Sequence, residues 1–474
     1  LIWTYANSMS TYIFEEKNRF KSFTKSLSEE ANNNKLLYIA LLIVFILGIA
    51  IRSFYISRPF HYDEAFTYLE YGRSPIGYIS MNYSYPNNHI LHSILVRIIT
   101  VVFGDELWLI RLPAFIGGIL TLILTFIVGR KWFGLKAGII AITLVVFSEI
   151  LIGYSVNARG YSLQTAVFLS VLFLTLNNNQ KTGRWIFISI LNAIGFWLIP
   201  SYLFCFGVIG ILYLSKHGIN KQSFFFFGLS CFLGFLLYLP VIGFLGANAL
   251  TNNPVVKVLS PTNFFQDYSN NLFTLYEHLV PGFGFVQIGV FSLLILTSFQ
   301  KQTKMFSIGI LLVISLMIAI MGKYVPPRVF TFILPLFALL FAGSILKYVS
   351  VLKPKYFLPL LILPLLSWSM LRNVKFDFEE GLNDIPEIVK DLKSHDKVGV
   401  ISKMPVDYSV RYYLTKNPEL NSAWNSFGTD TIYVIVNEFY QQELTKTFGK
   451  KSIGYQFKKI KKHKYSTLYI GLKN

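Results

Sequence analysis

Long apolar runs separated by short polar segments make up most of this 474-residue chain. Eleven of these runs approach the roughly 20 apolar residues that one membrane-spanning helix needs. They cover residues 36–55, 112–129, 137–154, 161–176, 185–200, 201–214, 224–247, 283–299, 306–321, 329–346 and 357–371. A further apolar stretch, 89–103, is short and contains Arg97, so its placement is open. The pattern predicts an all-α polytopic membrane protein with about 11 transmembrane helices.

Basic residues between the runs indicate how the chain is threaded through the membrane, because Lys and Arg are enriched in cytoplasmic loops. Five segments carry Lys or Arg and no acid, at 130–136, 181–184, 216–221, 301–304 and 347–355. All five fall on the side of the N-terminus if 89–103 does not span, and on the opposite side if it does. The first layout obeys the rule throughout, so we expect a cytoplasmic N-terminus and an external C-terminal region. Residues 56–111 then form one large external loop with juxtamembrane helices.

The composition changes from residue 372 onward, where the chain has 17 Lys or Arg and 12 Asp or Glu. Residues 383–395 have the pattern of an amphipathic helix, and 398–402, 431–437 and 466–473 have that of strands. We therefore expect three parts. They are a cytoplasmic N-terminal segment (1–35), a transmembrane domain (36–371) and a small external α/β domain (372–474).

The overall composition is typical of a membrane protein. Hydrophobic residues make up 53% and charged residues 14%, whereas soluble domains carry roughly 25% charged residues. These values exclude disordered, collagen-like and disulfide-rich classes. The net charge of +19 would suggest a nucleic-acid partner in a soluble protein. Here 12 of the 21 basic residues between positions 36 and 371 lie in the five basic segments, so the excess is mainly a topology signal and needs no nucleic acid.

Acidic residues are scarce between positions 36 and 371, where there are only eight, and five of them lie in the first external loop. The densest polar cluster is His61-Tyr62-Asp63-Glu64. Adjacent side chains on a helix point in different directions, so one carboxylate can face a cavity while the other braces a neighbour. A partly desolvated carboxylate has a raised pKa and suits a general base. The alternative is an ordinary solvated pair of loop acids.

A second polar cluster follows at 85–92, where Pro86 and two Asn residues indicate a turn before a helix. Asn88, His89 and His92 are candidate substrate-binding residues. His89 and His92 share a helix face and could hold a metal with Asp63. Hydrogen bonding within the loop is the favoured interpretation, so we assign no metal site and leave a divalent metal open.

Three arginines lie where the layout puts the outer membrane face. Arg111 opens the second span, Arg159 follows the third, and Arg328 opens the tenth. A guanidinium group fits a phosphate with two parallel hydrogen bonds, so these residues and Lys323 are candidates for a phosphate site. For any single arginine, contact with lipid headgroups or a salt bridge explains the position as well.

Taken in order, these motifs resemble the GT-C superfamily of membrane glycosyltransferases. The resemblance rests on Tyr62-Asp63-Glu64, Asn87-Asn88-His89-Ile90-Leu91-His92, Gly104, Arg111-Leu112-Pro113, Arg130…Gly134 and Ala158-Arg159-Gly160-Tyr161-Ser162-Leu163. The branch is that of protein mannosyltransferases and the bacterial aminoarabinose transferases of lipid A. The likeness is good over roughly 56–220 and weak afterwards, with Pro326-Pro327-Arg328 as a late landmark. Several relatives carry an acid after the third span, where this chain has Arg159-Gly160-Tyr161.

The resemblance implies inverting transfer of a sugar from a polyprenyl-phosphate donor to a hydroxyl acceptor on the non-cytoplasmic side of a bacterial plasma membrane. By position, Asp63 would be the base and Glu64 its partner, while Arg159 and Arg328 would hold the donor phosphate. Tyr161 and the residues of the two polar clusters would then line the substrate site. The acceptor could be a lipid, a glycan or a protein.

Two other functions compete with this one. A transporter or flippase of the same lipid carrier would be expected to show inverted repeats and polar residues near mid-span, and the chain has no duplicated halves. A non-catalytic protein of envelope-polymer assembly would carry its functional loop late in the chain, whereas here the polar cluster is early.

Overall fold

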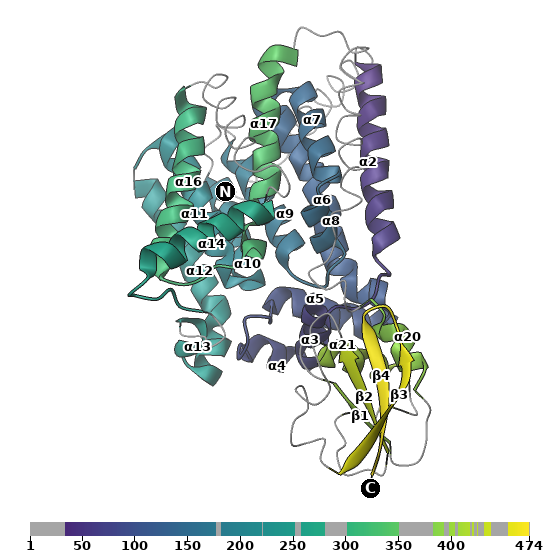
Figure 1. Cartoon of the computed structure of the whole chain (residues 1–474). Coiled ribbons are helices and arrows are strands. Elements are labelled where there is room, and N and C mark those ends of the chain that lie inside the picture. The colour runs from purple at the N-terminus through teal and green to yellow at the C-terminus, as the bar shows by residue number, and fades with distance from the viewer. Residues whose placement is uncertain are drawn as a thin grey trace, which may run out of the picture.

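The computed structural model describes residues 34–176, 182–219, 221–251, 257–279, 301–349, 383–392, 398–402, 406–417, 420, 424, 431–437 and 454–473. Within these residues the chain forms a helical bundle and a smaller domain built on a four-stranded sheet (Figure 1). Three predicted features lie outside the described residues: the spans 283–299 and 357–371, and the N-terminal segment up to residue 33.

The bundle helices follow the apolar runs of the sequence. They are α2 (Lys35–Tyr55), α6 (Leu107–Phe133), α7 (Leu135–Val146), α8 (Glu149–Ser155), α9 (Tyr161–Thr175), α10 (Thr182–Leu198), α11 (Leu203–His217), α12 (Lys221–Leu245), α16 (Lys301–Met321) and α17 (Ile333–Val349). Large apolar side chains such as Leu42 on α2 and Phe225 on α12 are each 58% exposed. Such an apolar outer surface is suited to contact with lipid.

The number of membrane crossings remains a prediction. Among the described residues, α2, α6 and α12 are long and apolar enough to cross a bilayer, and α7 with α8 makes a fourth if that pair is one span bent by 68°. The predicted span at 112–129 belongs to a longer helix, so Arg111 lies inside α6 and does not open it. Three of the basic segments meet at one end of the bundle, where Lys131, Arg184 and Lys216 interact electrostatically.

The predicted external loop contains four short elements. They are α3 (Tyr62–Thr67), the π-helical turn η1 (Tyr68–Gly72), α4 (Ile76–Met81) and α5 (Ile90–Phe103). The 14 residues of α5 span about 21 Å, less than the hydrocarbon core of about 30 Å. The ambiguous stretch 89–103 is therefore a short helix packed beside α4, η1 and α6.

Later loops contribute four further elements: the short η2 (Pro200–Tyr202), α13 (Asn248–Thr251) and η3 (Pro327–Phe330), and the longer α14 (Phe264–Leu279). Pro326 and Pro327 begin η3, because proline is well suited to the first positions of a helix. α14 packs on η3, and Asn271 of α14 bonds the main chain of Val325 in both directions. These contacts fix the segment that carries Arg328.

The C-terminal domain is α/β, as the sequence predicts. Its sheet has the order β1-β2-β4-β3, with β1 (Val398–Ile401) parallel to β2 (Thr431–Asn437). β4 (Ser466–Lys473) runs antiparallel to both β2 and β3 (Tyr455–Lys462). The helices are α20 (Ile385–Lys390), which is shorter than the predicted 383–395 in its described part, and α21 (Asp407–Thr415).

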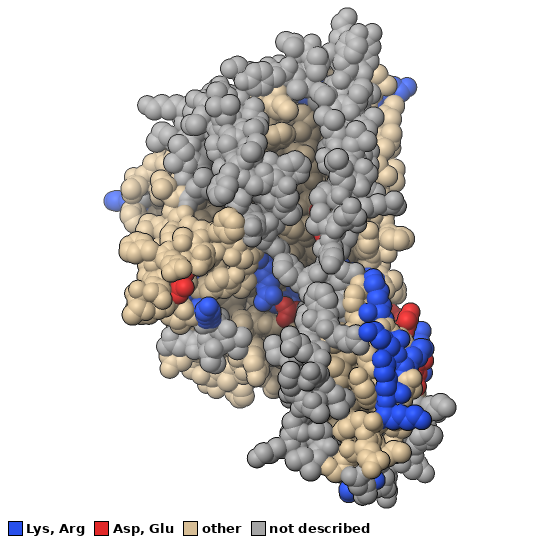
Figure 2. Space-filling view, in the orientation of Figure 1, with Lys and Arg blue, Asp and Glu red and all other residues tan. Residues whose placement is uncertain are grey.

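The sequence analysis missed β3 and α21. β3 is the edge of the sheet, and Lys458, Lys459, Lys461 and Lys462 are exposed along it. Figure 2 shows these basic side chains gathered on the C-terminal domain. Lysine on an edge strand prevents pairing with other chains, but it also removes the apolar alternation by which strands are recognised.

Candidate active site

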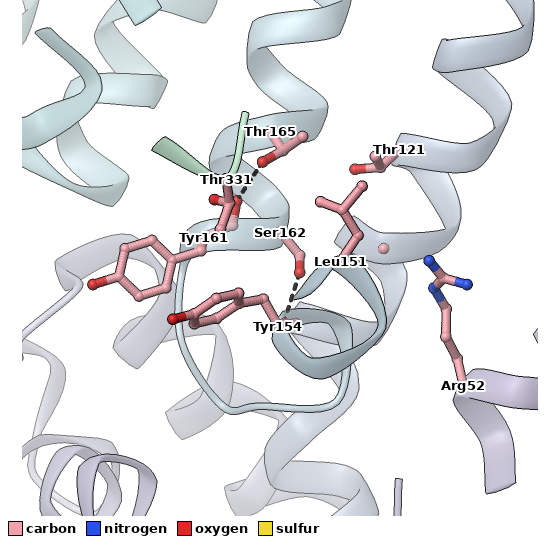
Figure 3. A pocket seen from close by; sticks show the side chains of 9 residues that line it. Arg52, Thr121, Leu151, Tyr154, Tyr161, Ser162, Thr165 and Thr331 are labelled. Carbon is pink, nitrogen blue, oxygen red and sulfur yellow. Dashed lines mark hydrogen bonds between the residues drawn. The ribbon is translucent and has the colours of Figure 1, made fainter. Parts of the chain in front are cut away.

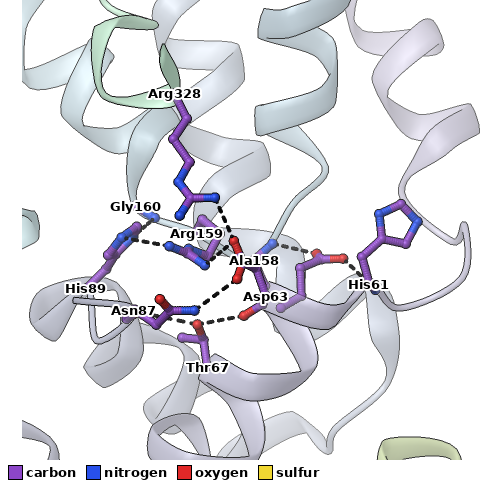
Figure 4. A network of polar contacts seen from close by, with 10 residues as sticks. His61, Asp63, Thr67, Asn87, His89, Ala158, Arg159, Gly160 and Arg328 are labelled. Atoms are coloured by element: carbon purple, nitrogen blue, oxygen red, sulfur yellow. Dashed lines mark hydrogen bonds and ion pairs between the residues drawn. The ribbon is translucent and has the colours of Figure 1, made fainter. Parts of the chain in front are cut away.

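Asp63 lies at the centre of a polar network between the loop helices and the bundle (Figure 4). Its Oδ2 atom is 3.1 Å from Nη1 of Arg159 and 3.0 Å from Nη1 of Arg328. Its Oδ1 atom accepts a hydrogen bond of 3.0 Å from the Asn87 side-chain amide. The Asp63 side chain keeps 25% of its surface exposed, so it remains accessible while it is paired with two cations.

Glu64 is fully buried and faces the other way. Arg111 binds it through two parallel hydrogen bonds, from Nε at 2.9 Å and from Nη2 at 2.7 Å. The Ala158 amide donates to Oε1 at 2.6 Å, and the His61 amide donates to Oε2 at 3.3 Å in a capping box at the start of α3. The two neighbouring carboxylates thus have different surroundings, as the spacing on a helix predicts.

Arg111 is saturated by its contacts. Beyond Glu64 it donates to the carbonyl groups of Ile56 and Arg58, both at 2.7 Å, and of Pro59 at 3.0 Å. These bonds use all five of its N–H donors, since a guanidinium group has no more. The predicted phosphate role of Arg111 is therefore at odds with this geometry, in which Arg111 braces Glu64 and the segment before α3.

The segment 156–160, between α8 and α9, places three donors at the site. Ala158 bonds Glu64, Arg159 pairs with Asp63, and the Gly160 amide donates to His89 Nδ1 at 2.7 Å. Two glycines of α6 allow this approach. A Cβ on Gly117 would lie 2.7 Å from the Leu163 nitrogen, and one on Gly118 would lie 2.2 Å from Cβ of Ser155. Small residues at these positions let α6 pack against both ends of the segment.

Arg159 is 2% exposed, and its guanidinium has donors to spare. Its Nε–H finds no acceptor among the described residues, and its Nη2 faces Nε2 of His89 at 3.3 Å. Because the Gly160 amide donates to Nδ1 of His89, the neutral ring carries its proton on Nε2. Two donors then face each other, so this edge of Arg159 is open to an anionic acceptor.

The pKa of Asp63 is lowered, and the predicted rise is wrong for this arrangement. Burial by itself raises the pKa of Asp63, but the nearby Arg159 and Arg328 guanidinium groups outweigh burial and hold it below its usual range. For Glu64, burial also raises the pKa, and Arg111 outweighs it and lowers the pKa to about 2. Burial, with help from Arg58, lowers the pKa of His61 to about 3.

The other predicted substrate residues occupy different positions around the network. The ring of Tyr161 lies under the guanidinium of Arg159, 5.6 Å from the ring centre. The hydroxyl of Tyr161 makes a hydrogen bond with Arg328. His92 is fully buried, and neither of its ring nitrogens has a partner among the described residues. The Asn88 amide group donates to the carbonyl groups of Ile79 and Asn82, so Asn88 supports the fold of the loop.

Three further predicted residues are peripheral to Asp63. Lys323 donates to the Thr251 carbonyl in an exposed loop, and no contact in the described chain joins it to Asp63. His61 is 3% exposed at the N-cap of α3. Tyr62 packs toward the C-terminal domain, with its ring 5.6 Å from that of Tyr408. Sequence reasoning did not select Asn87, although it lies in the quoted motif, or the amides of Ala158 and Gly160, which no residue type signals.

A small cavity lies on the bundle side of this network (Figure 3). It is lined by Arg52, Gly118, Thr121, Leu151, Tyr154, Tyr161, Ser162, Thr165 and Thr331. Arg52 is 1% exposed and donates to the carbonyl groups of Gly48, Val145 and Val146. It therefore caps the last turn of α7, where the bent pair α7–α8 breaks.

Comparison with known proteins finds one family match and several similar folds. Residues 87–244 match the family described as dolichyl-phosphate-mannose-protein mannosyltransferase. The fold resembles that of ArnT from Cupriavidus metallidurans in the apo state, with a TM-score of 0.57 and 10% identity over 93% of this chain and 98% of that one. The family match thus covers part of the chain, and the likeness to ArnT shows a similar fold. No curated protein matches the sequence.

Two further solved structures are similar to this chain. ArnT bound to undecaprenyl phosphate has a TM-score of 0.54, with the same 10% identity and the same coverage of both chains. The oligosaccharyltransferase of Archaeoglobus fulgidus, in complex with Zn and sulfate, has a TM-score of 0.48 and 12% identity over 91% of this chain and 72% of that one. The family match over residues 87–244 agrees with the resemblance inferred from the sequence motifs.

Proposed function

We propose that this chain is an integral-membrane glycosyltransferase that moves a sugar from a polyprenyl-phosphate donor to a hydroxyl acceptor on the non-cytoplasmic side, with inversion. The observation that carries the proposal is the pairing of one partly exposed carboxylate, Asp63, with two guanidinium groups from distant parts of the chain. The Asp63 carboxylate would serve as the base, and the two guanidinium groups would serve as the anion site. Both are needed when the leaving group is already a phosphate.

The phosphate site would consist of Arg159 and Arg328. The buried Nε–H of Arg159 meets no acceptor in the described part of the chain, and Arg328 is 37% exposed beside it. A phosphate with a charge of −1 or −2 would compete with Asp63 for both guanidinium groups. Arg111 has no part in this site because its donors are all occupied.

The reaction would proceed as a single displacement. The acceptor oxygen attacks the anomeric carbon, the bond from that carbon to the phosphate oxygen breaks, and the phosphate leaves with the electron pair. The acceptor proton passes to the Asp63 carboxylate, and the guanidinium groups stabilise the charge that develops on the leaving phosphate. Inversion requires the sugar to lie between Asp63 and the phosphate, so donor binding would part the ion pairs of Asp63 with the two arginines.

Removing Asp63 from these ion pairs would also activate it. While they are paired with Asp63, both arginines lower its pKa and make it a weak base. When the phosphate takes over the guanidinium groups, the remaining effect of burial raises the pKa toward a value better suited to accepting a proton. Asp63, flanked by two cations and an amide donor, is poorly placed to bind a divalent metal.

The decisive experiment is sugar transfer by the Asp63→Asn variant. Membranes containing the protein are supplied with a polyprenyl-phosphate sugar, and the products are followed by lipid and glycan mass spectrometry. We expect transfer to fall about 10²- to 10⁴-fold, with donor binding retained, while the exposed Glu106→Gln serves as the matched control. Near-normal transfer by Asp63→Asn would refute the role of the base, and donor flipping without any transfer would favour the transporter alternative.

A further inference from the structure

Helix α21 of the C-terminal domain joins that domain to the loop that carries the acids. Val410 and Leu414, on one side of α21, are buried in the core of the domain with residues of α20 and the sheet. Tyr408, Arg411 and Tyr412 are spaced i, i+3 and i+4, so they share the other face. That face contacts the first external loop, and α21 packs directly on α3 (Figure 1).

The segment just before α3 is held from both sides. The amide of Phe60 donates a 2.7 Å hydrogen bond to the Tyr413 hydroxyl, and the buried Phe60 ring lies 4.3 Å from that of Tyr412. From the bundle side, the guanidinium of Arg111 lies 5.5 Å from the centre of the same ring. Arg111 also holds the carbonyl groups of the preceding residues, so the start of α3 lies between α6 and α21.

Helix α3 itself rests on α21. The Tyr408 ring packs edge-on against Tyr62 at 5.6 Å and Phe66 at 4.7 Å. These two residues flank Asp63 and Glu64 along the chain. Because α3 has only six residues, contacts at both of its ends determine where Asp63 points.

Two ion pairs complete the junction. Arg411 lies 2.9 Å from Glu70, and Lys416 lies 2.6 Å from Asp105. All four side chains are roughly one-third to one-half exposed, between 32% and 46%. Such pairs contribute little stability individually and are weakened by salt, but a like charge introduced at either position would repel its partner.

We propose that α21 positions α3, the helix that carries Asp63 and Glu64. Sugar transfer then depends on docking of the C-terminal domain onto the first external loop. This inference rests on the proposed function for its catalytic consequence. Tyr413 and Tyr408 touch no reacting atom. They act by keeping α3 in the orientation that aims Asp63 at Arg159 and Arg328, and a misplacement of about 1 Å at a reacting group can cost about 10²-fold in rate.

The first test uses Tyr413→Phe, which keeps the ring and removes the acceptor for the Phe60 amide. The matched control is Tyr433→Phe, a buried tyrosine in the core of the same domain. Amide hydrogen exchange and transfer kinetics are measured on the full-length protein in nanodiscs. We expect Tyr413→Phe to speed exchange across residues 60–67 and to lower kcat about 10-fold, with the donor KM within about twofold. Exchange in β2 and β4 should stay at the wild-type rate.

The second test is a charge swap between the domains. Arg411→Glu places a carboxylate beside Glu70 and should reproduce both effects, while the double variant Glu70→Arg with Arg411→Glu should restore them. Unchanged exchange at 60–67 in both Tyr413→Phe and Arg411→Glu would overturn the proposal, as would a loss of transfer without any change in that exchange. The exchange readout needs no transfer activity, so it judges the docking separately from the proposed reaction.

Discussion

Arg328 donates to the carboxylate of Asp63 across 265 residues of sequence, at 3.0 Å. Arg159 meets the same carboxylate oxygen from a third part of the chain, at 3.1 Å. One acid from the first external loop is thus placed between cations from the segment after α8 and from η3. This convergence distinguishes the site from an ordinary pair of loop acids, which was the competing interpretation of the sequence.

Replacing either arginine by lysine should weaken use of the donor. Arg159→Lys and Arg328→Lys keep the charge but lose the planar fork that fits a phosphate. We expect each variant to raise the donor KM and to lower kcat/KM by about 10²-fold, measured with a polyprenyl-phosphate sugar in nanodiscs. The exposed Arg73→Lys, on the same loop, is the control. Wild-type donor affinity in both variants would favour contact with lipid headgroups instead.

The acid side of the pH profile should be flat over the neutral range. The paired arginines hold the pKa of Asp63 below its usual range, so its carboxylate stays deprotonated before the donor binds. As pH falls from about 8 to 5, kcat/KM should therefore show no loss from protonation of Asp63, whose ordinary pKa is about 3.9. The contrary result would be a fall in kcat/KM with a midpoint near pH 6 in the wild type that is absent from the residual activity of Asp63→Asn. It would show that the arginines do not lower the pKa of Asp63.

Breaking the Glu64–Arg111 pair should destabilise the protein. Both side chains are fully buried, and removing one partner leaves an uncompensated charge that costs about 3–5 kcal/mol. Glu64→Gln and Arg111→Met should each lower the unfolding temperature in detergent. The double variant should lose less than the sum of the two, because the partners are directly coupled. Additive losses would mean that the two side chains act independently.

His61 should make stability fall on acidification. Its pKa is lowered from 6.5 to about 3 by burial, so the unfolded chain binds a proton in that interval and the folded chain does not. Neutral His61 therefore costs the folded protein no stability above pH 6.5, and the stability of the folded protein falls as pH decreases from 6.5 toward 3. His61→Gln should flatten the dependence of the unfolding temperature on pH between 6.5 and 5. Parallel curves for the two proteins would contradict the assignment.

The predicted orientation in the membrane can be tested by cysteine labelling. The C-terminal domain and the first external loop contact each other, so they share one side of the membrane, and the basic segments predict that this side is external. In a variant without Cys205 and Cys231, a cysteine at the exposed Gly77 should react with an impermeant reagent on intact cells. One at the exposed Gly183 should react only after lysis. The reverse pattern would invert the layout.

The sequence by itself determined the class of the protein and the identity of its acids. Apolar runs specify helices because main-chain N–H and C=O groups in a membrane find no water, and a helix lets each segment satisfy them with its own hydrogen bonds. The strands 431–437 and 466–473 were predicted to the residue, since their apolar content is high. The scarcity of acids between positions 36 and 371 likewise singled out Asp63 and Glu64.

Only the tertiary structure decided what each charged residue does. The sequence made Arg111, Arg159 and Arg328 all candidates for a phosphate site, but Arg111 is saturated by Glu64 and three carbonyl groups. The pKa of Asp63 follows in the same way from its two cations, which no local pattern brings together. The role of α21 could not be predicted from the sequence, because its tyrosines act through contacts with the distant first external loop. A pairing energy depends on distance in space, and the chain order of these residues carries no such distance.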